Sequence, residues 1–280
     1  MRIAIEHRLS VTPPPGTTMA VLHLLVTPPG GPTQRVINWS VEGPGLGNAG
    51  RFVDGFGNAA HLVNQARPEG DIVIAVRGEV ETTDTHGVLG RLSGEPVPAL
   101  YRRFTPQTQI EREFIERYHD WGRSRVDLLH ALMAQVGEHI EAEDEGEAPA
   151  LQRQAQPDGV QVQVQVQGRN DAPAAELPIA RPPRPAADYA HLFIGAARAL
   201  NIPARFVTGY LLGTEDEGGL HAWAEAFDEG LGWIGFDPRM QLCPTDHYVR
   251  LAAGLDAITA PPLRLVPVAD IVQTAKVSVA

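Results

Sequence analysis

Residues 186–191 read Ala-Ala-Asp-Tyr-Ala-His and open the stretch, 186–238, that decides the fold. Apolar residues then recur at the 3.6-residue spacing of one helix face: Tyr189, Leu192, Phe193, Ala196, Ala197 and Leu200. Asp188 places a carboxylate where it complements the positive end of a helix dipole. Pro203 disfavours helical backbone in the residue before it. The pattern therefore predicts a helix that begins close to Asp188 and ends before Pro203.

An antiparallel hairpin is predicted to follow this helix. Residues 204–212 (ARFVTGYLL) are rich in β-branched and aromatic side chains and indicate a buried strand, and a polar, glycine-containing loop follows at 213–219. Residues 221–227 (HAWAEAF) alternate and indicate a second strand, and 228–232 (DEGLG) indicates a turn. Residues 233–237 (WIGFD) are expected to return as the partner of this second strand.

The hairpin is predicted to bring His221 and Asp237 together. Side chains on a strand alternate between its two faces, so the register decides which residues share a face. If Phe227 pairs with either Leu231 or Trp233, His221 and Asp237 share a face, about 5–7 Å apart at Cβ. The imidazole can then bond the carboxylate through one ring nitrogen and offer the other to a nucleophile. A nucleophile at the start of the preceding helix would be acidified by the helix dipole.

The order of these motifs resembles the transglutaminase-like superfamily, specifically its bacterial papain-like cysteine-peptidase branch. The resemblance covers about 186–265 and is carried by Asp188-Tyr189-Ala190-His191, His221-Ala222-Trp223, Gly235-Phe236-Asp237-Pro238, 247–254 and 260–262. It implies that His221 is the base and acid of an acyl transfer and that Asp237 orients it. The Gly-Val-Cys-Gln of the branch is replaced by Arg184-Pro185-Ala186-Ala187, which puts Ala186 at the nucleophile position.

Three further residues are candidates to support the pair: Asp188, His191 and Trp223. A helix cap and a helix-face residue explain Asp188 and His191 equally well. For His221 the alternative interpretation is a core histidine, and its register with Asp237 favours the site.

Composition limits the classes of function. The chain has 280 residues and a net charge of −11, which argues against nucleic-acid binding. We expect no membrane span and no signal peptide, because no long apolar run is present and the start alternates like a strand. Cys243 is the only cysteine, so no intrachain disulfide can form, and a cytoplasmic location is expected.

The expected fold class is α+β. Residues 1–95 show short alternating strands separated by Pro/Gly turns and predict an antiparallel β-sandwich, which resembles the β-rich domain that often precedes this core. The papain-like, transglutaminase-like core is expected at 96–280, with helices packed on an antiparallel sheet.

Residues 54–58 (DGFGN) indicate a hairpin turn rather than a calcium or anion loop. Three scattered histidines are interpreted as structural: His7, His23 and His61.

A low-complexity insertion is expected at about 141–187. It contains strict Val-Gln alternation at 160–167 and then Pro/Ala-rich sequence up to the predicted helix. One explanation is an insertion that evolved when catalysis was lost. The other is a pair of compensating frameshifts that garbled an active stretch, which the alternative reading frames of the coding DNA would reveal.

Three hypotheses for function remain open at this point. The first is a transglutaminase-like protein, bacterial by resemblance, whose catalysis is impaired by Ala186 and which keeps a groove for a peptide or protein amide. The second is an active amide hydrolase or acyltransferase, through Cys243 or in an undamaged parent sequence. The third is a non-catalytic protein that binds a partner. No cofactor or metal is expected, since His221, Asp237 and His247 lack tight ligand spacing; the oligomeric state is left open.

Overall fold

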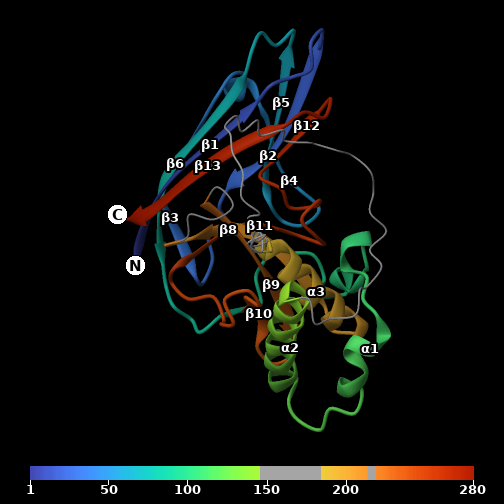
Figure 1. Ribbon diagram of the computed structural model, residues 1–280. Helices are drawn as coiled ribbons and strands as arrows, with labels where there is room; N and C mark the ends of the chain where they lie inside the picture. The colour runs from blue at the N-terminus through green and yellow to red at the C-terminus, as the bar shows by residue number, and fades with distance from the viewer. Residues whose placement is uncertain (146–183, 214–218) are drawn as a thin grey trace, which may run out of the picture.

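The computed structural model describes residues 1–145, 184–213 and 219–280. Two four-stranded antiparallel sheets form a sandwich, with strand orders β13-β1-β6-β3 and β12-β2-β5-β4 (Figure 1). The strands of the sandwich are β1 (Arg2–Val11), β2 (Met19–Thr27), β3 (Gln34–Glu42), β4 (Gly50–Val53), β5 (Ala59–Ala66), β6 (Ile72–Thr82), β12 (Leu263–Val266) and β13 (Ile271–Val279). The β-rich amino-terminal region predicted from the sequence is therefore confirmed.

Alternation along the strands explains this sandwich. In β1, every second residue from Ile3 to Val11 is buried, and the residues between them are exposed or half-buried. Leu22 and Leu24 of β2 face the same core and are completely buried. One face of β1 and of β2 is thus largely apolar, and packing the two sheets against each other removes these faces from water.

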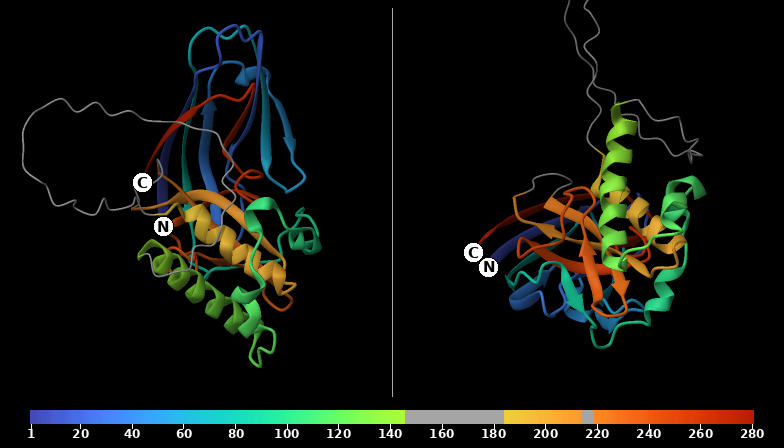
Figure 2. Two further views of the ribbon diagram at one scale, coloured as in Figure 1. Left: turned by 45° about the vertical axis from the view of Figure 1, so that its right-hand side comes forward. Right: turned by 90° about the horizontal axis from the view of Figure 1, so that it is seen from below.

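The remaining strands form a five-stranded sheet in the order β11-β8-β9-β10-β7, with the helices gathered on it (Figure 2). The strands are β7 (Val88–Gly90), β8 (Ala204–Leu211), β9 (Leu220–Asp228), β10 (Gly232–Phe236) and β11 (Tyr248–Gly254). The helices are α1 (Arg112–Ile115), α2 (Arg125–Glu145) and α3 (Ala186–Ala199), with short 3-10 turns at Leu46–Asn48, Pro98–Arg102, Pro106–Thr108 and Glu116–Tyr118. This α+β architecture is the fold class that the sequence predicts.

Helix α3 lies on a face of β9 that consists of alanines. The small side chains of Ala222, Ala224 and Ala226 share one buried core with α3 and allow the helix to approach the sheet closely. Phe193 of α3 stacks on Phe236 of β10, with ring centroids 5.3 Å apart. The alternate residues of β9, among them His221, are thereby left for the opposite face.

Sheet membership differs from the expected division at residue 95. Strand β7 pairs with β10 of the core sheet, whereas β12 pairs with β2 and β13 pairs with β1 of the sandwich. The end of the chain, which fell within the expected core at 96–280, therefore completes the sandwich rather than the core. The Val-Gln run at 160–167 lies outside the described residues.

The loop at 54–58 is a hairpin turn between β4 and β5, as predicted. Asp54 Oδ1 accepts the backbone N–H groups of Phe56 and Asn58, each at 2.8 Å, so the carboxylate closes the turn instead of facing a cation. Asn58 reaches the core sheet from this turn and makes two hydrogen bonds with the backbone of Ala253.

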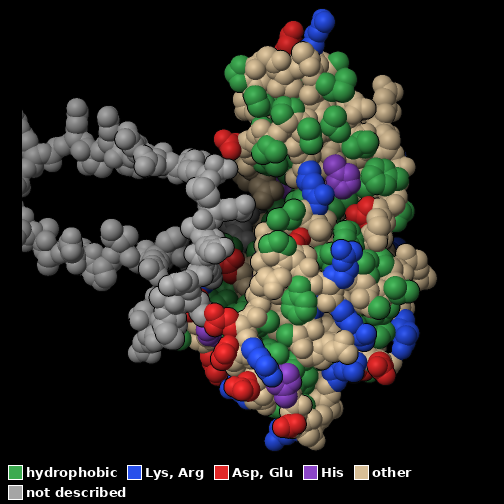
Figure 3. All heavy atoms as spheres, turned by 90° about the vertical axis from the view of Figure 1, so that its right-hand side faces the viewer, with side chains coloured by type: hydrophobic (Ala, Val, Ile, Leu, Met, Phe, Trp, Pro, Cys, Tyr) green, Lys and Arg blue, Asp and Glu red, His purple; other side chains and the backbone are tan. Residues whose placement is uncertain are grey.

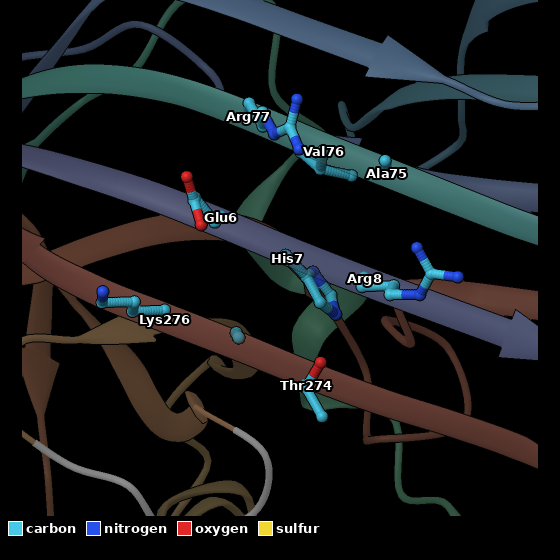
Figure 4. A pocket seen from close by; sticks show the side chains of 9 residues that line it. Glu6, His7, Arg8, Ala75, Val76, Arg77, Thr274 and Lys276 are labelled. Atoms are coloured by element: carbon cyan, nitrogen blue, oxygen red, sulfur yellow. The ribbon is translucent and has the colours of Figure 1, made fainter.

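The surface carries mixed charges. Figure 3 shows acidic, basic and apolar side chains interspersed on one face. A groove of about 310 Å³ lies on the sandwich, and Glu6 on β1 stands there between Arg77 of β6 and Lys276 of β13 (Figure 4). These charges follow the cross-strand register, which is how exposed faces of antiparallel sheets are commonly stabilised. Among the described residues, no helix has the length and apolar character to cross a membrane.

Candidate functional site

The structure brings His221 and Asp237 together. Trp233 pairs with Phe227, which is one of the two registers that put both residues on the same face. His221 Nε2 lies 2.5 Å from Asp237 Oδ2. The histidine is 3% exposed and the aspartate is completely buried. An ionised carboxylate can only accept, so in this contact Nε2 is the donor and Nδ1 is the ring nitrogen that does not face Asp237.

The carboxylate of Asp237 is fully hydrogen-bonded. Its Oδ1 accepts the backbone N–H groups of Arg239 and Met240, each at 3.1 Å. Its Oδ2 accepts the hydroxyl of Tyr248 at 2.8 Å in addition to the imidazole of His221. A buried carboxylate with four donors is fixed in position, as the orienting role that the resemblance implies for Asp237 requires.

Aromatic rings surround the imidazole. Trp223, two residues along β9, stacks beside His221 with ring centroids 6.3 Å apart, and Tyr248 meets both rings edge-on. Gly209 of β8 is the cross-strand partner of His221, and a Cβ there would lie 2.5 Å from Cη2 of Trp223. The absence of a side chain at position 209 is therefore what admits the indole ring.

Ala186 is the first residue of α3 and is completely buried in the helix-facing core. Arg198, near the end of α3, bonds to the carbonyl of Ala204 at the start of β8, so the beginning of the helix points toward the opposite end of that strand. That end of β8 pairs with the start of β9. His221 projects from the face of β9 away from the helix. The start of α3 therefore lies toward the same end of the sheet as the first residues of β9, where His221 is located.

Asp188 and His191 are not hydrogen-bonded to the pair within the described part of the chain. Asp188 lies half-buried in the first turn of α3, as a helix-terminal carboxylate does. His191 Nε2 accepts the backbone N–H of Ala257 at 3.0 Å, and its ring stacks on Phe206 at 4.9 Å. Burial lowers the pKa of His191, which keeps it neutral and able to accept. Its observed contacts tie α3 to the loop after β11.

A buried cluster of charges lies next along the same face of β9. Glu225 accepts Nε of Arg205 at 2.5 Å and Nε of Arg250 at 3.0 Å, and Arg205 also bonds Glu95 at 2.7 Å. Burial by itself would raise the pKa of Glu225, but the charges of Arg205 and Arg250 outweigh it and lower that pKa. The Arg205 guanidinium also lies 3.9 Å from the centre of the Trp233 ring. The two positive and two negative charges balance each other. Their hydrogen bonds link β8, β9 and β11 beside the site.

Cys243 is a poor substitute nucleophile. It lies half-buried in the loop between β10 and β11, and burial raises the pKa of its thiol. Raising that pKa lowers the thiolate fraction, and the thiolate is the reactive form. His247 is exposed, and no group of three or more His, Cys, Asp and Glu side chains suited to a metal occurs in the described ranges.

Sequence reasoning missed Tyr248. The segment that contains it was noted for its resemblance, but its contact with Asp237 depends on β11 pairing with β8 at Tyr248 and Leu211. This register joins two segments that are distant in the sequence, and no local sequence pattern predicts it. An aromatic residue at the start of a buried strand that follows the aspartate is the only signal, and it is weak.

Two stretches of the chain match models of known protein families. Residues 184–238 match the model of the transglutaminase-like superfamily, and residues 3–81 match that of the bacterial transglutaminase-like N-terminal region. Over these two stretches the chain is similar to transglutaminase-like proteins. The first match contains Ala186, His221 and Asp237, so the alanine lies within the superfamily core itself.

One solved structure shares the fold of this chain. A crystal structure from Cytophaga hutchinsonii, described as that of a candidate cysteine protease, has a TM-score of 0.64 at 17% identity and covers 99% of this chain and 90% of that chain. The periplasmic domain of TgpA from Pseudomonas aeruginosa has a TM-score of 0.25 at 15% identity, over 86% of this chain and 90% of that chain. An uncharacterized protein of Mycobacterium leprae is 34% identical over 84 residues, which span 28% of this chain and 29% of that protein.

Proposed function

We propose that this transglutaminase-like protein binds a peptide or protein amide without transferring its acyl group. The observation that carries the proposal is the intact, buried His221–Asp237 pair combined with alanine at the first residue of α3. Acyl transfer of this type needs a thiolate that attacks the amide carbonyl, a base that takes the proton and a carboxylate that orients the base. The chain supplies the last two groups and a methyl group in place of the first.

Binding can outlast the loss of the nucleophile. When a nucleophile and its partners act as a unit, removal of the nucleophile alone abolishes almost all of the rate that the unit provides, while the groups that hold the substrate are unaffected. A site without turnover is then a recognition site for the same chemical class. We further propose that the protein is bacterial, by its resemblance to the bacterial branch, and that it acts in the cytoplasm, where its single cysteine stays reduced; cell fractionation tests this location.

The decisive experiment uses the natural chain with a blocked glutamine dipeptide, benzyloxycarbonyl-glutaminyl-glycine, and hydroxylamine as the acceptor. Transfer would form a hydroxamate and release ammonia, and we expect neither. A fluorescently labelled glutamine peptide should nevertheless bind in an anisotropy titration, and His221→Ala should weaken that binding. Hydroxamate formation that is abolished by alkylation of Cys243 would contradict the proposal in favour of an active enzyme. Absence of both turnover and binding would contradict it in favour of a purely structural protein.

A further inference from the structure

Tyr248 is the one side chain besides His221 that hydrogen-bonds to Asp237 in the described part of the chain. Both side chains bond to the same atom, Oδ2, whereas the backbone donors bond to Oδ1. The backbone therefore anchors one oxygen, and the hydroxyl of Tyr248 determines how the other oxygen is presented to the imidazole. Without that hydroxyl, the only bonds other than the one to His221 that fix the orientation of the carboxylate would be the backbone bonds to Oδ1.

The tyrosine is suited to this task. Its ring is 6% exposed and lies against the rings of His221 and Trp223, at 5.9 Å and 5.4 Å between centroids. Burial, and then the charge of Asp237, raise the pKa of the phenol, so the hydroxyl stays protonated and can only donate to the carboxylate. The position of the hydroxyl is set in turn by the strand that carries it.

That strand, β11, is an edge of the core sheet, and its outer side is bonded by carboxamide side chains. Gln34 of β3 accepts the N–H of Arg250 at 2.7 Å and donates to the carbonyl of the same residue at 2.8 Å. Asn58 makes the same pair of bonds with Ala253, both at 2.8 Å. A carboxamide has the donor and acceptor of a peptide group, so each replaces one residue of a missing neighbouring strand.

The two carboxamides differ in their distance from the site. Gln34 is 4% exposed and holds the residue two positions after Tyr248, whereas Asn58 holds a residue five positions after it. A bulge in the pairing of β11 with β8 lies between Arg250 and Ala252, and so separates the two anchoring points. The anchor at Gln34 is thus the one coupled to the hydroxyl.

We propose that Tyr248 is a positioning residue that aligns Asp237 for His221, and that Gln34 of the N-terminal sandwich holds it in place through β11. The N-terminal sandwich then contributes to the site through its hydrogen bonds to β11. This inference rests on the proposed function, because it concerns the same pair. The test of this inference measures the proton between His221 and Asp237, not peptide binding. A negative result would therefore not bear on whether the protein binds a peptide.

The test measures the proton between His221 and Asp237 by NMR in the full-length protein, as its resonance position and its exchange rate with water. The signal is assigned by its loss in His221→Asn. Tyr248→Phe keeps the ring against its aromatic neighbours and removes only the hydroxyl. We expect the resonance to move and exchange to become about fivefold faster, the factor that one typical net hydrogen bond represents. The matched control is Tyr210→Phe, which removes another buried hydroxyl, the one bonded to His7, and should change neither quantity.

The role of Gln34 is tested on the same signal. Gln34→Met should accelerate exchange, whereas Asn58→Leu, the matched control that removes the other carboxamide bonded to β11, should not. In the double variant with Tyr248→Phe, the effect of Gln34→Met should vanish, because it acts through the lost hydroxyl. Equal exchange rates in the natural chain and in Tyr248→Phe would overturn the role of Tyr248. A Gln34→Met effect that persists without the hydroxyl would overturn the coupling, and the Tyr248 measurement decides by itself if Gln34→Met does not fold.

Discussion

His7 makes the stability of the fold sensitive to acid. Its ring on β1 is 2% exposed, and its Nδ1 lies 2.9 Å from the hydroxyl of Tyr210, a residue of the core sheet. Burial lowers the pKa of His7 from 6.5 to about 4. In the unfolded chain the same imidazole takes up a proton near its ordinary pKa. The folded state therefore binds fewer protons than the unfolded state between these two values, and acid favours unfolding.

The size of the effect follows from the two pKa values. The contribution of His7 is fully present above pH 6.5 and is lost as the pH falls toward 4. Complete loss corresponds to about 3 kcal/mol, because each unit of pKa is worth about 1.4 kcal/mol. At pH 4.5 most of it, about 2.5 kcal/mol, is already gone. That is a large share of the roughly 5–15 kcal/mol that stabilises a typical protein.

The assay is urea unfolding at pH 7.5 and pH 4.5, compared between the natural chain and His7→Gln. The glutamine keeps a polar partner for Tyr210 but does not titrate. We expect its free energy of unfolding to fall by about 2.5 kcal/mol less than that of the natural chain between the two pH values. His86→Gln is the control, since that side chain is 93% exposed, and it should behave like the natural chain. Equal losses in the natural chain and in His7→Gln would refute the reasoning.

Three further predictions concern single contacts. Gly209→Ala should destabilise the fold by about 1–3 kcal/mol, because the new Cβ meets the Trp223 ring and the carbonyl of Val249; thermal unfolding measures this, and an unchanged melting temperature would speak against the close packing. Glu225→Gln should cost about 3–5 kcal/mol, since it removes one buried partner and leaves Arg205 and Arg250 with excess charge; a loss below 1 kcal/mol in denaturant unfolding would show that water screens the cluster. Ser124→Ala should cost about 1 kcal/mol, because Ser124 Oγ accepts the N–H of Asp127 at the start of α2, whereas Ser124→Asp should restore stability if this cap is the cause.

The local parts of the fold could be predicted from the sequence. Helix α3 and the β9–β10 hairpin follow from periodicity and turn residues, and the hairpin register puts His221 beside Asp237 because only a short turn separates the two strands. The start of α2 is equally local, since the cap formed by Ser124 and Asp127 spans only three residues.

The parts that depend on distant pairings could not be predicted. Gln34 and Arg250 are 216 residues apart in the sequence, and neither carries a pattern that points to the other. The pairing of β13 with β1 is of the same kind, because an alternating strand fits several edges equally well. Tyr248 was missed for this reason. Its hydroxyl reaches Asp237 only after β11 has found its place in the sheet.

The central claim is that the His221 imidazole, held by Asp237, is in reach of a side chain at the start of α3, where this chain has Ala186. The most direct measurement is the rate at which iodoacetamide alkylates the thiol introduced by Ala186→Cys, followed at pH 6 by mass spectrometry of the peptide that contains position 186. An ordinary thiol, with a pKa of about 8.5, is under about 1% ionised at that pH. An imidazole in reach would stabilise the thiolate, so we predict alkylation at least about tenfold faster in Ala186→Cys than in the double variant that adds His221→Ala. Equal rates in the two variants would contradict the account.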